Sequence, residues 1–488
     1  MDILHNIFEK LSYNPQEPLI FSSGLFWVLF LVFMPVYGWL KNKRTQMIVF
    51  VVLFSFYFYY KCSGLFVLLL LVTSFIDWIV SRCMADPKMG KGMRRFCLLL
   101  SIMTSIGILL YFKYANFFLW NVNALFSSNF APLELILPVG ISFYTFQSVS
   151  YVVDVYKRRL EPTDTWLEYA FFLSFFPALV AGPIVRADYF IPQVKENRRA
   201  TRNEVYTGLL FILLGVIKKA VVADYIAQFN DLVFDAPGDY HGFEAFMGIV
   251  GYLIQIYCDF SGYSDMAIGI ALIMGFRLVP NFNFPYKARN VSDFWRRWHI
   301  SLSSWLRDYI YIPLGGNRKG KTRTYVNNFL TMLIGGLWHG AAWKYIIWGA
   351  MHGGGLIAHK MSRPWLDKIP DNFLTKAFFW FTTMVFLSLT FVVFRVTDIG
   401  DTWTVVSSVF DDFHWESIPA FFVTRTAWAI LVALIILAHA LPTRFWRHLT
   451  DAFVESPWLD KLIIFIIVIQ LVIEFQSSEV APFIYFQF

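Results

Sequence analysis

The chain of 488 residues is too apolar for an ordinary soluble domain, because 57% of its residues are hydrophobic and only 15% are charged, against about 25% charged in soluble domains. The net charge of +7 belongs to the loops between apolar runs and does not indicate a nucleic-acid-binding surface. The four cysteines show no CxxC pairing or metal-ligand spacing, so neither a disulfide framework nor a metal site is predicted.

The first third of the chain predicts five membrane crossings. After an amphipathic start over 1–20, which we expect at the membrane interface, apolar runs follow at 25–40, 47–60, 64–80, 97–112 and 134–155. Basic residues gather after the first, third and fifth of these runs, at Lys41, Arg82 and Lys157 among others. By the positive-inside rule, these three loops are cytoplasmic and the N-terminus lies outside.

The next segment, 166–185, has basic residues on both sides and is broken by Pro177, Gly182 and Pro183. These features predict a re-entrant or kinked segment rather than a clean span. Runs near 205–224 and 243–274 then cross again around an acidic outer loop. Within the second run, Asp259 and Asp265 are either hydrogen-bonding anchors between helices or groups that take part in chemistry.

Residues 281–343 are far more polar than the rest of the chain. At about 100° per residue, Asp293 to Tyr309 predicts one amphipathic helix. Its apolar face holds Phe294, Trp298, Leu302, Trp305 and Tyr309, and its polar face holds Arg296, His299, Ser303 and Arg307. The following GGNRKGKT (315–322) spells a phosphate-loop pattern, but that loop requires a preceding strand in a soluble α/β unit. We therefore interpret it as a basic cytoplasmic loop.

An apolar run over 330–358 contains His339 in the sequence Trp338-His339-Gly340. Fully helical, it would be about 43 Å long, more than the roughly 30 Å of hydrocarbon, and its many glycines predict breaks or tight helix crossings. His339 is either a core hydrogen-bonding group or a functional residue. His352 lies roughly 220° further around a continuous helix, so we expect no shared face and assign it no role.

Runs near 377–395, 426–441 and 461–475 bring the expected total to about eleven spans. No internal repeat is visible. The sequence therefore predicts a polytopic all-α membrane protein with additional re-entrant and interfacial helices, folded as one domain over 1–488.

Several long motifs together resemble the membrane-bound O-acyltransferase family, in particular its bacterial polysaccharide branch, typified by the membrane subunit of alginate O-acetyltransferase. They cover nearly the whole chain, with a core region at 257–360. The motifs are LPVGISFYTFQSVSYVVDVY (137–156), FFPALVAGPIVRA (175–187), YCDFSGYSDMAIG (257–269), DFWRRWHISLSSWLRDYIYIPLGG (293–316), GGLWHGAAW (335–343) and APFIYFQF (481–488).

This resemblance implies a helical bundle that contains a funnel, with His339 as the catalytic histidine and His299 as the second motif histidine beside the acyl path. A neutral imidazole is a suitable general base. Substrate-binding roles are expected for Arg296, Arg297, Trp298 and Trp338. The arginines either meet an anionic carrier, such as phosphopantetheine or coenzyme A, or only set the topology. The tryptophans either line an acyl site or serve packing.

The function implied is O-acyl transfer, with acetyl as the expected group. The acyl group would pass from a cytoplasmic thioester, acetyl-coenzyme A or an acyl carrier, with no bound cofactor. It would move across the inner membrane toward an exported polysaccharide or an extracytoplasmic partner acyltransferase. The alternatives are D-alanyl transfer to teichoic acid and an acyl-group channel or transporter without chemistry. The lack of repeated halves argues against a transporter.

Overall fold

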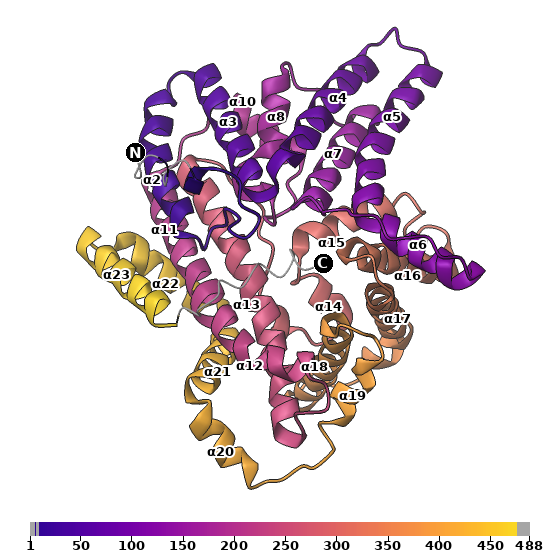
Figure 1. Ribbon diagram of the computed structural model, residues 1–488, viewed down its shortest axis with the longest axis vertical. Helices are drawn as coiled ribbons and strands as arrows, with labels where there is room; N and C mark the ends of the chain where they lie inside the picture. The colour runs from indigo at the N-terminus through magenta and orange to yellow at the C-terminus, as the bar shows by residue number, and fades with distance from the viewer. Residues whose placement is uncertain (1–4, 6–8, 476–488) are drawn as a thin grey trace. The chain divides into compact units, whose positions relative to one another are not determined.

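The computed structural model describes residues 5 and 9–475, and within these ranges the chain is helical, with no strand (Figure 1). The predicted all-α class is confirmed. The chain forms two compact units, one of 1–209 with 266–279 and one of 210–265 with 280–488. The single domain over 1–488 stays a prediction. The motif at 481–488 and part of the predicted interfacial start lie outside the described residues.

The first unit contains most of the N-terminal helices. They are α2 (Gly24–Leu40), α3 (Arg44–Ser63), η1 (Gly64–Phe66), α4 (Val67–Ala85), α5 (Lys91–Leu109), η2 (Leu110–Tyr114), α6 (Ala115–Phe126), α7 (Ile141–Tyr156), α8 (Trp166–Ser174), α9 (Phe176–Leu179) and α10 (Ala187–Lys195). Two long helices, α11 (Arg202–Val216) and α13 (Gly242–Met274), contribute residues to both units.

The second unit contains the polar motif region and the C-terminal helices. They are η3 (Ile217–Ala223), α12 (Asp224–Asp235), η4 (Pro285–Lys287), α14 (Val291–Trp295), α15 (Ile300–Leu306), η5 (Arg307–Tyr311), α16 (Gly320–His339), α17 (Trp343–Leu366), α18 (Phe373–Arg395), α19 (Asp401–Ser407), α20 (Ser417–Thr424), α21 (Thr426–Ala440), α22 (Thr443–Glu455) and α23 (Trp458–Phe475). No strand precedes 315–322, so the phosphate-loop interpretation is rightly rejected.

By length and composition, five helical stretches of the described chain are suited to cross a membrane, or six if the bent pair α20–α21 is one span. The expected total of about eleven is not confirmed. One of the five stretches, Arg44–Ala85, is 42 residues long and includes a break at Gly64, whose φ is +59°. Two predicted crossings therefore fall within this one stretch.

The segment 166–185 is kinked, as predicted. Helix α8 has 9 residues, about 14 Å, which is too short to span a bilayer. It ends before Pro177, and the buried Phe176 ring then packs against rings from α2 and α3. Phe176 lies 5.6 Å from Phe33 and 5.0 Å from Phe54 between ring centres. This segment therefore forms part of the core of the first unit.

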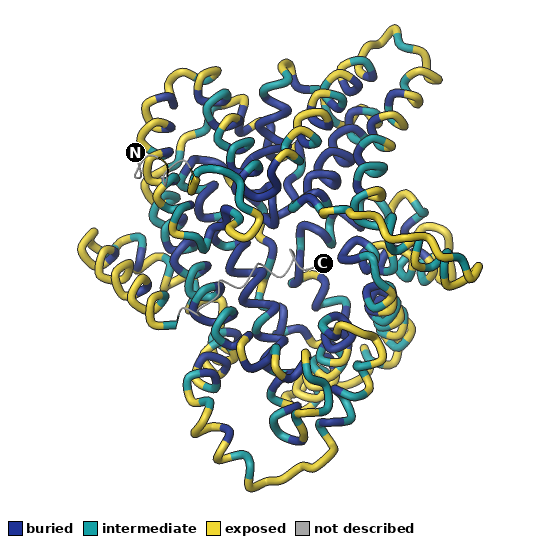
Figure 2. The backbone as a smooth tube through the Cα atoms, viewed as in Figure 1, coloured by how far each residue is buried: buried dark blue, intermediate teal, exposed yellow. Residues whose placement is uncertain are grey.

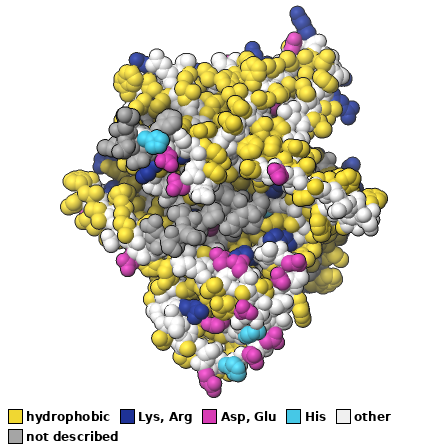
Figure 3. Space-filling model, in the orientation of Figure 1, with side chains coloured by type: hydrophobic (Ala, Val, Ile, Leu, Met, Phe, Trp, Pro, Cys, Tyr) yellow, Lys and Arg dark blue, Asp and Glu magenta, His cyan; other side chains and the backbone are white. Residues whose placement is uncertain are grey.

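The helices of the first unit differ in exposure (Figure 2). Helix α7 is buried along most of its length, whereas α5 is largely exposed. Apolar side chains cover much of the visible surface of α4 and α5, and basic side chains lie at the tip of this hairpin (Figure 3). An exposed apolar surface of this kind is expected where helices face lipid.

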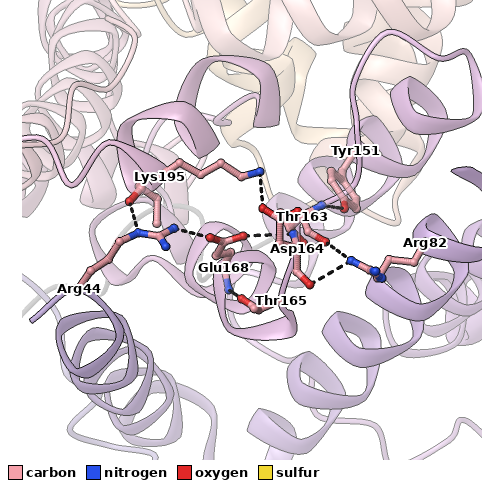
Figure 4. A network of polar contacts seen from close by, with 9 residues as sticks. Arg44, Arg82, Tyr151, Thr163, Asp164, Thr165, Glu168 and Lys195 are labelled. Carbon is pink, nitrogen blue, oxygen red and sulfur yellow. Dashed lines mark hydrogen bonds and ion pairs between the residues drawn. The ribbon is translucent and has the colours of Figure 1, made fainter.

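A polar network joins five helices of the first unit (Figure 4). Arg44 pairs with Glu168, and Lys195 Nζ lies 2.9 Å from an Asp164 carboxylate oxygen, a hydrogen bond that lowers the pKa of Asp164. Arg82 donates to the Asp164 carbonyl at 3.0 Å. Basic residues from the predicted cytoplasmic loops after the first and third apolar runs thus meet in one network.

Candidate functional site

The predicted helix Asp293–Tyr309 is broken, and this part of the prediction is wrong. Helix α14 ends at Trp295 and α15 begins at Ile300. Between them, His299 has a φ of +44°, in the left-handed region that non-glycine residues rarely adopt. Backbone hydrogen bonds between this segment and residues 281–283 explain the break in the helix. The Asn283 N–H donates to Arg297 O, and the Ile300 N–H donates to Asn281 O, both at 2.9 Å.

The predicted burial is correct for the apolar face of this segment and only partly correct for its polar face. Four residues expected on the apolar face are buried, as predicted: Phe294, Trp298, Leu302 and Trp305. On the polar face, the Arg296 and Arg307 side chains are exposed. His299 is the exception, because its side chain is fully buried. The left-handed residue turns it away from the polar stripe on which a continuous helix would place it.

Asn281 holds the His299 ring. Its Oδ1 accepts from the Ser301 N–H at 3.3 Å and the Ser301 hydroxyl at 2.9 Å, and it lies 3.2 Å from His299 Nδ1. A backbone N–H can only donate, so the Asn281 atom that faces it is the oxygen. His299 must then carry its proton on Nδ1, which leaves the lone pair on Nε2. Burial lowers the pKa of His299, which lies outside the candidate spans, to about 3.

His339 is the last residue of α16, and its side chain is 3% exposed. The chain is extended at Gly340 and turns into α17. The two helices cross closely, since a Cβ on Gly336 would lie 2.2 Å from Tyr345 O and one on Gly349 would lie 2.5 Å from Met332 O. The prediction that glycines in 330–358 produce a break and a tight crossing is confirmed.

The structure brings the two predicted histidines together. The ring centres of His299 and His339 are 6.4 Å apart. Since a ring nitrogen lies about 1 Å from its ring centre, these nitrogens cannot reach the roughly 3 Å of a direct hydrogen bond. Trp338 lies against both rings, at 5.8 Å from His299 and 5.0 Å from His339.

The other predicted substrate-binding residues have different surroundings. Trp298 is buried against Phe294 and Phe391, with ring centres 5.5 and 5.4 Å away. Arg296 and Arg297 pair with Asp293, at 3.7 and 3.1 Å. Their roles stay predictions.

Three residues near the histidines were missed from the sequence: Asn281, Trp348 and His352. The Trp348 ring lies 5.0 Å from the His339 ring and 4.6 Å from the His352 ring. His352 had been excluded because a continuous helix would put it on another face. The break at Gly340 removes that argument, because His339 and His352 belong to different helices. The glycine-rich sequence between His339 and His352 was the signal in the sequence that could have indicated this break.

Asp259 and Asp265 form ion pairs with two lysines of η3. Lys219 Nζ lies 2.6 Å from Asp259 and 2.7 Å from Asp224, and Lys218 Nζ lies 2.7 Å from Asp265. These contacts favour the interpretation as anchors between helices. Among the described residues, no group of three or more histidine, cysteine or carboxylate side chains could hold a metal ion.

Comparison with known families matches residues 27–396 to the membrane-bound O-acyltransferase family. The chain belongs to this family. It is therefore a multi-pass membrane O-acyltransferase. It is similar to a probable alginate O-acetylase, AlgI, of Pseudomonas putida, with 36% identity over 493 residues, which covers 96% of this chain and 100% of the relative.

Two other relatives carry different names. A peptidoglycan O-acetyltransferase of Helicobacter pylori is 36% identical and covers 80% of each chain. A teichoic acid D-alanyltransferase of Bacillus subtilis is 31% identical over 54% of this chain and 70% of its own length. The similarity to the O-acetyl-transferring relatives is thus both higher and longer.

Proposed function

We propose that this protein is an O-acetyltransferase of the inner membrane. It would pass an acetyl group from a cytoplasmic thioester toward an exported polysaccharide, directly or through an extracytoplasmic partner acyltransferase. The observation that carries this proposal is the buried pair of His299 and His339, whose ring centres are 6.4 Å apart. The names of the alginate and peptidoglycan relatives support acetyl as the group and a polysaccharide as the acceptor.

In the proposed step, neutral His339 takes the proton of an acceptor hydroxyl while that oxygen attacks the thioester carbonyl carbon. A C–O bond forms, and the carbonyl π electrons move onto the carbonyl oxygen. The intermediate then collapses, the C–S bond breaks, and His339 returns its proton to the leaving thiolate. The products are an ester and a free thiol. Burial of both rings keeps water from competing with the acceptor.

His299 has a separate task in this proposal. With its Nδ1 proton held by Asn281, the neutral ring can accept a hydrogen bond at Nε2 but cannot donate one there. It therefore suits orientation of the acceptor hydroxyl rather than stabilisation of the oxyanion. The spacing of the two rings leaves room for a hydroxyl between their nitrogens.

The acyl donor is a substrate in this scheme, and no bound cofactor is required. Arg296 and Arg297 lie directly before the histidine turn, and the Arg296 side chain is 73% exposed. Guanidinium groups suit the phosphates of acetyl-coenzyme A or of a phosphopantetheine carrier. We assign these arginines to the entry of the donor.

The orientation is proposed with the N-terminus outside. Arg44 and Arg82 come from two predicted cytoplasmic loops and join one polar network, which supports a common side. In intact cells, an impermeant thiol reagent should label single cysteines introduced in 116–132 and miss those in 82–95. Labelling within 82–95 would reverse the orientation.

The test of the function is to delete the gene and complement it with the wild-type chain. Ester-linked groups on exported polymers are then identified by NMR and mass spectrometry. We expect acetyl esters to disappear and return. Loss of D-alanyl esters instead would support the teichoic acid alternative. The shorter match to the Bacillus subtilis relative is the observation that favours this alternative. A channel without chemistry predicts that purified protein leaves acetyl-coenzyme A intact when an acceptor glycan is present.

A further inference from the structure

The Trp348 ring, which contacts His339, also contacts a second histidine, His352, and the surroundings of His352 define its protonation. His352 is fully buried on α17, and the indole N–H of Trp295 donates to its Nδ1 at 3.2 Å. An indole nitrogen can only donate, so His352 Nδ1 is the acceptor. In the neutral ring the proton therefore sits on Nε2, and His352 presents an N–H donor at that atom.

Two buried N–H groups in this cluster have no acceptor among the described residues. Within residues 9–475, neither His352 Nε2 nor Trp348 Nε1 has a hydrogen-bond partner. Their side chains are 0% and 1% exposed, and their ring centres are 4.6 Å apart. Buried donors nearly always have a partner in a folded protein. Of the buried polar atoms without a partner among the described residues, these two belong to rings that contact each other, and one of the rings contacts His339, so a ligand or water oxygen that accepts from both would complete the site.

The position of these donors suggests which oxygen they receive. The Trp348 ring contacts both His339 and His352. The remaining neighbours are apolar, with Phe394 at 5.4 Å from Trp348 and Phe386 at 5.4 Å from His352. Neutral donors within an apolar wall suit a small uncharged acyl group whose oxygen gains negative charge during the reaction.

We propose that His352 Nε2–H and Trp348 Nε1–H donate hydrogen bonds to the carbonyl oxygen of the acyl thioester and stabilise its oxyanion. This assignment rests on the proposed acyl transfer at His339. The two histidines then have different roles. His339 is the general base that removes a proton, whereas His352 keeps its Nε2 proton and donates a hydrogen bond. Trp295 is the positioning residue that holds the required tautomer of His352.

The experiment exploits glutamine, which can accept and donate hydrogen bonds but cannot act as a base. Four variants are compared: His352→Gln, His352→Phe, Trp348→Phe and His339→Gln. His439→Phe is the matched control. His439 is also a buried histidine of this unit, but it packs on Tyr257 and Tyr286 and has no part in the proposed chemistry. The measurements are the acetyl ester content of exported polysaccharide, the membrane level and the melting temperature of each variant.

Removal of one oxyanion donor should lower turnover by about 10²–10³-fold. We expect His352→Phe and Trp348→Phe to lose acetylation at membrane levels and melting temperatures similar to those of His439→Phe. His352→Gln should retain activity within about tenfold, since its amide can replace the donor. His339→Gln should be inactive.

Three results would overturn the assignment. One is normal acetylation with His352→Phe. Another is a folded His352→Gln as inactive as His352→Phe, which would mean that the imidazole itself exchanges a proton. If His352→Phe does not accumulate, Trp348→Phe decides, and normal acetylation there also overturns it. By contrast, an active His339→Gln would refute the proposed function itself.

Discussion

Two buried polar clusters in this protein differ in how completely their hydrogen bonds are satisfied. In the first unit, Asp77 is fully buried, yet its carboxylate accepts from Ser101 at 2.5 Å, Ser148 at 2.6 Å and Tyr169 at 2.7 Å. These contacts join α4 to α5, α7 and α8. In the second unit, the His352 and Trp348 donors beside His339 are equally buried but lack acceptors among the described residues.

The difference separates structure from function. The buried Asp77 carboxylate accepts hydrogen bonds from three protein hydroxyls in place of water. Because these hydroxyls come from three other helices, the contacts stabilise one arrangement of four helices. Buried donors without acceptors weaken the fold by about 1–3 kcal/mol each, and a ligand that accepts from both would offset this cost. The Asp77 cluster should therefore govern stability, and the His339 cluster should govern turnover.

The strongest test of this contrast is His339→Gln. If His339 is the general base, turnover should fall by about 10²–10⁴-fold, because an amide cannot take a proton at neutral pH. The membrane level and melting temperature should stay close to those of the wild type. Acetyl ester content per unit of membrane protein measures the effect. Near-normal acetylation would leave His339 as a core hydrogen-bonding group only.

The opposite pattern is expected for Asp77→Ala. Three buried hydroxyls would lose their acceptor, at a cost of about 3–9 kcal/mol in total, so the melting temperature and the membrane level should fall. Acetylation per folded molecule should not change. Asp77→Asn keeps one acceptor oxygen and should be milder. A loss of turnover without a loss of stability in Asp77→Ala would end the distinction between the two clusters.

Acid should destabilise the second unit through His299. Its pKa in the folded chain is about 3, below the usual 6.5, so the unfolded chain binds more protons as the pH falls below 6.5. Stability is therefore complete above that value and should drop by about 2 kcal/mol between pH 7 and pH 5. Melting curves over this range check the effect, and His299→Phe should make the dependence shallower by about 2 kcal/mol. Burial also lowers the pKa of His352 to about 3, so part of the dependence should remain. An equally steep dependence in this variant would assign it to other groups.

The smallest effect is expected at Asn281, which sharpens the role of His299. Asn281→Leu removes the acceptor that holds the Nδ1 proton, together with the hydrogen bonds of Asn281 to Ser301 and Ser264. Loss of the bond to His299 alone corresponds to about a tenfold fall in turnover. Ser303→Ala is the control, because Ser303 lies on the polar stripe and donates only to Trp298 O, at 3.3 Å. Equal activity of both variants would show that the tautomer of His299 does not matter.

Much of this architecture could be predicted from the sequence. Local patterns indicated the all-α class, the buried ring face of 294–305, the kink near Pro177 and the tight crossing at Gly336. Each depends on neighbours in the chain, through helical periodicity, a missing N–H or the absence of a Cβ. The two motif histidines were also found in this way, with the help of the family resemblance.

What the sequence alone could not determine depends on groups far apart in the chain. The periodicity that predicted one helix over 293–309 could not anticipate that Asn281 and Asn283 would form backbone bonds with Ile300 and Arg297. These bonds break the helix and bury His299. Likewise, His339 and His352 share the neighbour Trp348 only because α16 and α17 fold back against each other. Helical faces are local properties, whereas hydrogen-bond partners and ring neighbours are decided when distant segments pack.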